Sequence, residues 1–330
     1  MTSVRLTMSG LDVDFPVDAG VTAIFGPRGA GKSLLLDAIA GFVRPDAGRI
    51  LLNDAILFDA ATRVHLPPQK RGCVLVPPGD SLFPLMTARQ NLMFAAKRWP
   101  RLERHRRVAE ITEKFQLTGG SPRLRWVLAR SLVAEPKLLL IDDRELDSGL
   151  DAALLREVRE NTSAPILLAS RNLDLCCAAD QLLVLDGGRI LQRGAPRLVV
   201  DRPQSVEVAR LIGIPNLFEA TVGALDPSRN TSSLDFGHFT LSGPYFPGHF
   251  RGDRIWVAMA AENLVVHAGD IAPGTNYVAL ELIRTVPRAR SVSLEFSFGV
   301  FATLSYDDFA RQKDNKSWLV EFPPEALRIL

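Results

Sequence analysis

An eight-residue glycine-rich loop places the strongest constraint on the fold of this chain. The loop matches the pattern G-x-x-x-x-G-K-[ST] and consists of Gly26, Pro27, Arg28, Gly29, Ala30, Gly31, Lys32 and Ser33. The apolar run 21–25 before it predicts a buried strand, and residues 33–40 after it predict a helix that ends at Gly41. Such a turn directs successive backbone N–H groups toward phosphate oxygens, so the segment predicts nucleotide binding rather than a glycine-rich turn without a ligand.

The residue types of this loop assign the parts of a nucleotide site. Lys32 is expected to reach the β- and γ-phosphates, and the Ser33 hydroxyl is expected to bind Mg²⁺. A second apolar run, 138–141, ends at Asp142 and predicts a neighbouring strand whose terminal carboxylate holds Mg²⁺ through water. The sequence therefore predicts that the chain binds ATP together with Mg²⁺.

The remaining pattern predicts two domains. The chain has 330 residues, and typical domains contain about 100–200. Further buried runs between helices predict an α/β nucleotide-binding domain over 1–215, with a parallel sheet covered on both faces and a helical insert at about 80–135. Short alternating runs separated by Gly, Pro and Asn predict a small β-barrel domain over 216–330.

Composition narrows the possible functions. Apolar residues make up 47% and charged residues 23%, which is typical of globular proteins, and the net charge of +2 argues against a dedicated nucleic-acid binder. Cys73, Cys176 and Cys177 form neither a disulfide framework nor a zinc pattern, which favours a reducing compartment. The start has no apolar leader and no run of 18 apolar residues occurs, so we expect a soluble, cytoplasmic chain.

Several segments together resemble the ATP-binding subunits of ABC transporters. Besides the glycine-rich loop, the segments that carry this resemblance are 40–50, 66–71, 81–87, 117–121, 125–132, 135–136, 148–151 and 185–190. The resemblance covers nearly all of the first 215 residues. From Asn216 onward the chain resembles the C-terminal oligonucleotide-fold-like domain of importer ATPases for molybdate, sulfate, iron or related solutes, and residues 217–220 favour the molybdate type.

The resemblance implies partners and further site residues. It implies a homodimer or heterodimer of ATP-binding subunits, transmembrane permease subunits, indirect work with a periplasmic solute-binding protein, and a peripheral position on the cytoplasmic face of the membrane. Thr118, Gly119 and Gly120 resemble the signature loop that meets the γ-phosphate held by the partner subunit, and Asp143 stands at the position of the catalytic carboxylate. The candidates for permease contact, which core packing explains equally well, are Leu82, Phe83, Leu85 and Met86.

Several positions depart from the resembled pattern, and they bear on hydrolysis. Pro78 stands where a glutamine is expected, Asp143 is one methylene shorter than the usual Glu, and Arg171 replaces a histidine. Arg171 is a candidate γ-phosphate ligand as a fixed cation. Residues 144–147 add about two positions before the segment 148–151. A one-residue slip in the comparison would move the Pro78 and Arg171 assignments, and the signature segment has an alternative register.

Two hypotheses from different classes follow. The first is an ATPase that couples ATP binding and hydrolysis to uptake of a molybdate-like oxyanion. The second is a nucleotide-binding but hydrolysis-deficient regulatory or partner subunit. A DNA-repair ATPase is disfavoured because the chain lacks long coiled-coil insertions. The basic run 97–107 lies on an amphipathic helix pattern and is best interpreted as a solvated helix face, so no nucleic-acid partner is expected.

Overall fold

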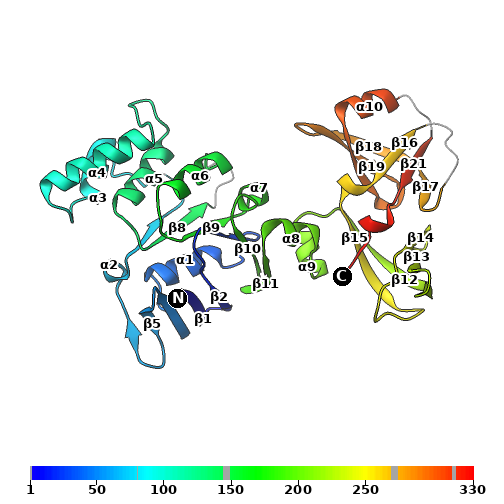
Figure 1. The fold of residues 1–330 in the computed structure, drawn as a ribbon, viewed down its shortest axis with the longest axis horizontal. Helices are drawn as coiled ribbons and strands as arrows, with labels where there is room; N and C mark the ends of the chain where they lie inside the picture. Colours follow the sequence, from blue (N-terminus) through cyan, green and yellow to red (C-terminus); the bar gives the residue numbers. More distant parts are fainter. Residues whose placement is uncertain (1, 80, 144–148, 269–273, 314–316) are drawn as a thin grey trace. The chain divides into compact units, whose positions relative to one another are not determined.

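Two compact units make up the chain (Figure 1). The computed structural model describes residues 2–79, 81–143, 149–268, 274–313 and 317–330. The first unit spans residues 1–201 and the second spans residues 202–330. The predicted insertion at 144–147, and Ser148 of the segment 148–151, lie outside the described residues. None of the helices in the described ranges combines the length and the apolar character needed to cross a membrane.

The first unit is built on a mixed sheet. Its strands are β1 (Ser3–Met8), β2 (Leu11–Pro16), β3 (Val21–Phe25), β4 (Ala47–Leu52), β5 (Ala55–Asp59), β6 (Val64–His65), β7 (Cys73–Val76), β8 (Leu138–Asp143), β9 (Ile166–Ser170), β10 (Gln181–Asp186) and β11 (Arg189–Gly194). Their order is β6-β5-β4-β1-β2-β11-β10-β3-β9-β8-β7. The predicted parallel sheet is the part β10-β3-β9-β8-β7. Antiparallel pairs join β1, β2, β4, β5 and β6, and the sequence analysis did not predict this part of the sheet. The alternating burial of β1 and β2 is the period-2 pattern of one-sided antiparallel strands.

Helices cover the parallel strands and form the predicted insert. They are α1 (Lys32–Ala40), α2 (Pro68–Arg71), α3 (Ala88–Ala95), α4 (Arg101–Lys114), α5 (Arg123–Val133), α6 (Ala152–Glu160), α7 (Leu173–Cys176) and α8 (Pro196–Asp201). Helix α1 packs against β7, β8 and β9, while α3, α4 and α5 pack on one another at one end of the unit (Figure 1). Pro122 is the N-cap of α5, and the hydroxyl of the preceding Ser121 accepts from the Thr118 amide.

A buried arginine fixes the end of α1. The side chain of Arg71 is only 1% exposed. Its guanidinium donates to the carbonyl oxygens of Leu66, Ala38 and Ile39 at 2.8, 2.7 and 2.8 Å. The last two belong to the final turn of α1, where helix carbonyls lack partners inside the helix. A Cβ atom at Gly41 would lie 2.5 Å from Nε of Arg71, so the glycine after the helix leaves the space that the guanidinium fills.

Three small sheets form the second unit. Its strands are β12 (Asn216–Asp226), β13 (Thr231–Asp235), β14 (Thr240–Gly243), β15 (Arg254–Met259), β16 (Val265–Ala268), β17 (Tyr277–Leu280), β18 (Leu282–Pro287), β19 (Ser291–Phe296), β20 (Phe301–Ser305), β21 (Trp318–Glu321) and β22 (Arg328–Ile329). Its helices are α9 (Val206–Leu211), α10 (Tyr306–Gln312), η1 (Ala261–Asn263), η2 (Ser297–Gly299) and η3 (Pro324–Ala326). The sheet orders are β14-β13-β12-β15-β22, β16-β21-β17 and β18-β19-β20. The predicted β domain is therefore present, but its described strands pair as three sheets and not as one closed barrel.

Two buried asparagines join these sheets. The amide of Asn216, at the start of β12, exchanges two hydrogen bonds with the backbone of Phe301 in β20, at 2.7 and 2.6 Å. The amide of Asn276 does the same with the backbone of Ser242 in β14, at 2.6 Å for each bond. Each asparagine side chain thus makes the pair of hydrogen bonds that the backbone of a neighbouring strand would otherwise make where two sheets meet.

The units divide earlier in the chain than the predicted boundary at 215/216. Helix α9 packs against β12 and β15, which places it in the second unit. Ser205 caps this helix, because its hydroxyl accepts from the Val208 amide at 3.3 Å. The sequence predicts a helix over 205–212, and the structure places it after the division at 201/202.

Candidate nucleotide-binding site

The glycine-rich loop joins β3 to α1, as the sequence predicts. A Cβ atom at Gly26 would lie 2.0 Å from the Leu185 carbonyl oxygen, so only glycine fits against β10. Gly31 is the N-cap of α1 and has a φ of 103°, a conformation that favours glycine. The loop therefore leads directly into a helix whose first backbone N–H groups lack intrahelical partners. This is the geometry that binds phosphate.

Lys32 lies inside the curve of this loop. Its side chain is 7% exposed, and Nζ donates to the carbonyl oxygens of Gly26 and Pro27 at 2.6 and 2.8 Å. Burial, followed by the nearby guanidinium of Arg171, lowers the pKa of Lys32, while Asp142 acts in the opposite direction. A buried cation and a half-buried cation that repel each other favour a polyanionic ligand.

Strand register gathers the predicted residues at one edge of the sheet. Ser170 of β9 is the partner of Phe25 in β3 on one side and of Asp143 in β8 on the other. The three strands are parallel, so their carboxyl ends meet where the loop begins. Arg171 follows β9 directly, and Asp142 and Asp143 end β8. The structure thus brings the loop, Asp142, Asp143 and Arg171 together.

The side-chain oxygen atoms at this edge are of the kind that Mg²⁺ takes as ligands. Asp142 is buried and lies close enough to Lys32 to raise its pKa, which places its carboxylate beside the loop. The Ser33 hydroxyl belongs to the first turn of α1 at the same place. Mg²⁺ takes one or two protein oxygens and completes its shell with water and substrate phosphates, so these two residues suffice.

Asp143 is the second buried carboxylate of the edge, and it is 6% exposed. Its Oδ2 accepts a hydrogen bond of 2.7 Å from the Ser170 hydroxyl. Cys176 of α7 lies close enough to this group to sense its charge: burial raises the pKa of the Cys176 thiol to about 12, and Asp143 adds to this effect. Ser170 and Cys176 are neighbours of the site that sequence analysis missed. The polar end of the apolar run 166–170 was the available signal for Ser170.

The signature-like residues lie elsewhere in the unit. Thr118, Gly119 and Gly120 are exposed in the connection between α4 and α5, within the helical insert. The Thr118 amide donates to the Ser121 hydroxyl at 2.9 Å, and the Ser121 amide donates back to the Thr118 carbonyl at 3.0 Å. They therefore form a separate exposed turn and do not line the loop of their own chain.

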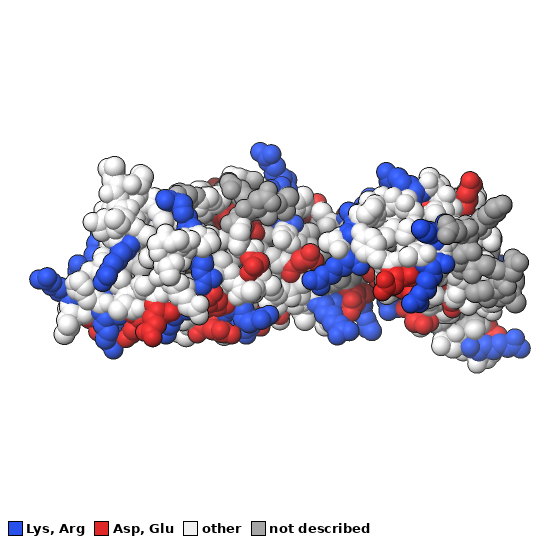
Figure 2. Space-filling view, turned by 90° about the horizontal axis from the view of Figure 1, so that it is seen from above, with Lys and Arg blue, Asp and Glu red and all other residues white. Residues whose placement is uncertain are grey.

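The remaining predicted positions are placed as follows. Pro78 follows β7, the strand beside β8, and is half-buried. Asp151 caps α6, since its carboxylate accepts from the Leu154 amide at 2.7 Å. The basic helix α4 pairs its cations with acidic neighbours, as Arg107 does with Glu103. Lys and Arg are interspersed with Asp and Glu over the first unit on the face drawn in Figure 2.

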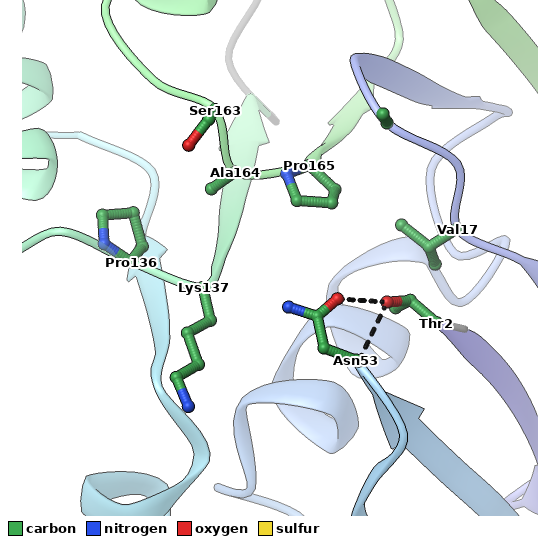
Figure 3. Close-up of a pocket in the computed structure, with 9 residues that line it drawn as sticks. Thr2, Val17, Asn53, Pro136, Lys137, Ser163, Ala164 and Pro165 are labelled. Atoms are coloured by element: carbon green, nitrogen blue, oxygen red, sulfur yellow. Dashed lines mark hydrogen bonds between the residues drawn. The ribbon is translucent and has the colours of Figure 1, made fainter.

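A cavity of about 420 Å³ lies at the opposite edge of the sheet (Figure 3). Its wall includes Lys137 and Pro165, which directly precede β8 and β9 and so mark the amino ends of these strands. Thr2 and Asn53 in the same wall are joined by a hydrogen bond between Oγ1 and Oδ1 of 3.2 Å. The cavity is therefore separate from the loop edge.

Comparisons with known proteins agree with this geometry. The model of a family described as "ABC transporter" matches residues 11–144. The molybdate/tungstate import ATP-binding protein WtpC of Archaeoglobus fulgidus is 34% identical over 239 residues, which are 67% of this chain and 96% of that protein. The chain belongs to the ABC transporter family. The family match includes the loop, the signature-like turn, Asp142 and Asp143.

Two further likenesses extend the assignment. The molybdenum import ATP-binding protein ModC of Mycobacterium tuberculosis is 36% identical over 250 residues, which are 68% of this chain and 66% of that protein. The structure of cbiO1 from Clostridium perfringens, part of the ABC transporter complex cbiONQ, has a TM-score of 0.52 at 23% identity and covers 64% of this chain and 94% of its own. The latter shows a shared fold. The ABC transporter assignment thus rests on sequence and fold together.

Proposed function

We propose that this chain is the ATP-binding subunit of an ABC importer that takes up a molybdate-like oxyanion. The observation that carries the proposal is the 34% identity over 96% of a molybdate/tungstate import ATP-binding protein. The chain would act as a peripheral subunit on the cytoplasmic face of the membrane. Its direct partners would be transmembrane permease subunits, and a periplasmic solute-binding protein would deliver the oxyanion to them.

The loop edge supplies the groups that this function needs. The backbone N–H groups of 26–33 and the ammonium of Lys32 would hold the ATP phosphates, and Arg171 would add a fixed charge near the γ-phosphate. Ser33 and Asp142 would hold Mg²⁺, which offsets phosphate charge when bound. Asp143 would orient the attacking water. These roles use each group for positioning and for electrostatic stabilisation, which dominate phosphoryl transfer.

A second subunit would complete each site. Thr118, Gly119 and Gly120 are exposed on a turn in the helical insert, and a phosphate at the loop of the same chain would be held by other residues. We propose that this turn meets the γ-phosphate in a partner subunit, in either a homodimer or a heterodimer. Backbone N–H groups of two successive glycines suit such a contact because no side chain blocks their approach.

Helix α3 and the residues just before it form an exposed apolar surface that suits contact with a permease subunit. Leu85 is 99% exposed, and Phe83, Met86 and Phe94 are exposed beside it. The rings of Phe83 and Phe94 contact each other edge to face, with centroids 5.1 Å apart. Leu82 is buried, so it contributes to the core and not to this surface. Exposed apolar groups of this size mark interaction sites more often than free surface.

Uptake in cells tests the proposed solute. Cells without the gene for this chain are expected to lose high-affinity accumulation of labelled molybdate, and the native gene is expected to restore it. The Lys32→Ala gene is expected not to restore it, because ATP binding drives the cycle. Sulfate accumulation in the same cells is the control. A loss of sulfate accumulation with molybdate uptake intact would contradict the proposed solute.

Phosphate release tests the role of Asp143. The Asp143→Asn variant is expected to release phosphate roughly 10²-fold more slowly than the native chain, because an amide orients the attacking water without accepting its proton. Its affinity for ATP is expected to stay the same, since the phosphates are held by the loop. Steady-state phosphate release and equilibrium ATP binding measure the two quantities. Equal release by both chains would remove Asp143 from the reaction.

The second candidate function is a hydrolysis-deficient partner subunit. The observation that favours it is that three positions depart from the resembled pattern. Pro78 stands where a glutamine is expected, Asp143 where a glutamate is expected, and Arg171 where a histidine is expected. This function predicts ATP binding without phosphate release above the Lys32→Ala background. It also predicts that Asp143→Glu gains release, because the longer side chain restores the reach of the carboxylate.

A further inference from the structure

We propose that Ser170 is a positioning residue for ATP hydrolysis, which fixes the direction of the Asp143 carboxylate. The inference rests on the proposed role of Asp143. Ser170 ends β9, and its side chain is completely buried. It is the register partner of Asp143 across two parallel strands, so the two side chains stand on the same side of the sheet.

The hydrogen bonds around Ser170 define which way its proton points. The hydroxyl oxygen accepts from the Asn172 amide at 3.0 Å, and the hydroxyl donates to Oδ2 of Asp143 at 2.7 Å. A serine hydroxyl has a single proton to donate, and the hydrogen bond from the Asn172 backbone N–H occupies one of its lone pairs. The one proton of the Ser170 hydroxyl is therefore donated to the Asp143 carboxylate. A bond to a charged acceptor is about twice as strong as a neutral one, so it restrains the carboxylate effectively.

The other carboxylate oxygen is left available. Oδ1 of Asp143 is buried and has no hydrogen-bond partner among the residues that the structure describes. A buried polar atom without a partner costs free energy, and native structures keep few of them outside functional sites. Oδ1 is thus the atom that we assign to the attacking water. Ser170 holds Oδ2 and thereby sets where Oδ1 points.

This restraint matters more for aspartate than for the usual glutamate. The Asp143 carboxylate sits one methylene closer to its strand, and it has less freedom to reach a water by rotation. A displacement of about 1 Å at a reacting group can cost on the order of 10²-fold in rate. The buried Ser170 hydroxyl, at the end of the neighbouring strand, restrains the Asp143 carboxylate without entering the phosphate site.

The test compares Ser170→Ala, Ser170→Cys and Ser170→Thr in the full chain. Ala removes the donor, Cys keeps the volume but donates weakly, and Thr keeps the hydroxyl. We expect Ala and Cys to lower kcat for ATP hydrolysis about tenfold, with KM for ATP nearly unchanged and with Thr recovering most of the rate.

Two controls separate positioning from a structural role. In the Asp143→Asn background, Ser170→Ala is expected to lower kcat no further, because its effect acts through the carboxylate. The Asn172→Ala variant removes the cap of α7, in which the Asn172 side chain accepts a hydrogen bond of 3.2 Å from the Leu175 amide. It leaves the hydrogen bond between Ser170 and Asp143 in place. It is therefore expected to retain the native kcat.

Three results would overturn the inference. The first is an unchanged kcat in Ser170→Ala. The second is a raised kcat in Ser170→Ala, which would mean that the hydroxyl holds the carboxylate away from the attacking water. The third is that Ser170→Ala lowers kcat equally in the native and the Asp143→Asn backgrounds. The proposed role of Asp143 fails separately. It fails when Asp143→Asn alone leaves phosphate release unchanged.

Discussion

Replacing Lys32 by alanine is expected to weaken ATP binding by about a hundredfold or more. The ammonium lies within the loop, bonded to the carbonyls of Gly26 and Pro27, so it is already placed where phosphates would meet the backbone N–H groups. Charge-assisted hydrogen bonds contribute about 1.5–3 kcal/mol each, and about 1.4 kcal/mol corresponds to a factor of ten in affinity. Arg171 remains in the variant, but its charge alone does not replace a donor at the centre of the loop.

Equilibrium binding of ATP with Mg²⁺ measures this effect. Lys137→Ala is the matched control, because Lys137 is an exposed lysine at the opposite edge of the same sheet. The control is expected to bind like the native chain. Equal affinities of the Lys32→Ala and native chains, with both folded by circular dichroism, would move the phosphate site away from this loop.

Replacing Arg71 by methionine is expected to lower the free energy of unfolding of the first unit by about 3–5 kcal/mol. The substitution keeps much of the volume but removes every donor, so the carbonyl oxygens of Leu66, Ala38 and Ile39 lose their bonds to the guanidinium. A buried acceptor that loses its partner costs about 1–3 kcal/mol, and of the three carbonyls Ala38 keeps a second bond, from the Gly41 amide at 3.2 Å. Two of the three carbonyls end α1, so the damage reaches the helix that begins at the phosphate loop.

Denaturant unfolding of the full chain measures the change in the transition of the first unit. Lys70→Met is the matched control, since Lys70 is the exposed neighbour on the same short helix α2. It is expected to change the free energy of unfolding by less than about 0.5 kcal/mol. A loss below about 1 kcal/mol for Arg71→Met would mean that water replaces the guanidinium at these carbonyls.

Local sequence signals predicted the part of the site that local structure builds. The strand 21–25 and the start of the following helix need no information beyond their own residues, because glycine spacing and apolar runs specify the turn. The same holds for β8, where an apolar run ends in two carboxylates. The helical insert followed from its amphipathic period.

The contacts that sequence analysis missed connect residues far apart in the chain. Ser170 and Asp143 are 27 positions apart, Arg71 and Ala38 are 33 apart, and Asn216 and Phe301 are 85 apart. No periodicity marks such pairs, because strand order decides which residues meet. The antiparallel part of the first sheet was missed for a related reason. The prediction of the first sheet rested on continuous apolar runs, and β1 and β2 instead alternate buried and exposed residues.

The guanidinium beside Lys32 has a consequence for the kind of anion that the loop edge accepts. Arg171 directly follows β9, and its charge is close enough to Lys32 to lower the pKa of the ammonium. A guanidinium presents its N–H donors in one rigid plane, whereas an ammonium is a compact point charge. The loop edge therefore offers two cations of different geometry, and this pair suits a branched oxyanion such as a phosphoryl group better than an anion with a single charged oxygen.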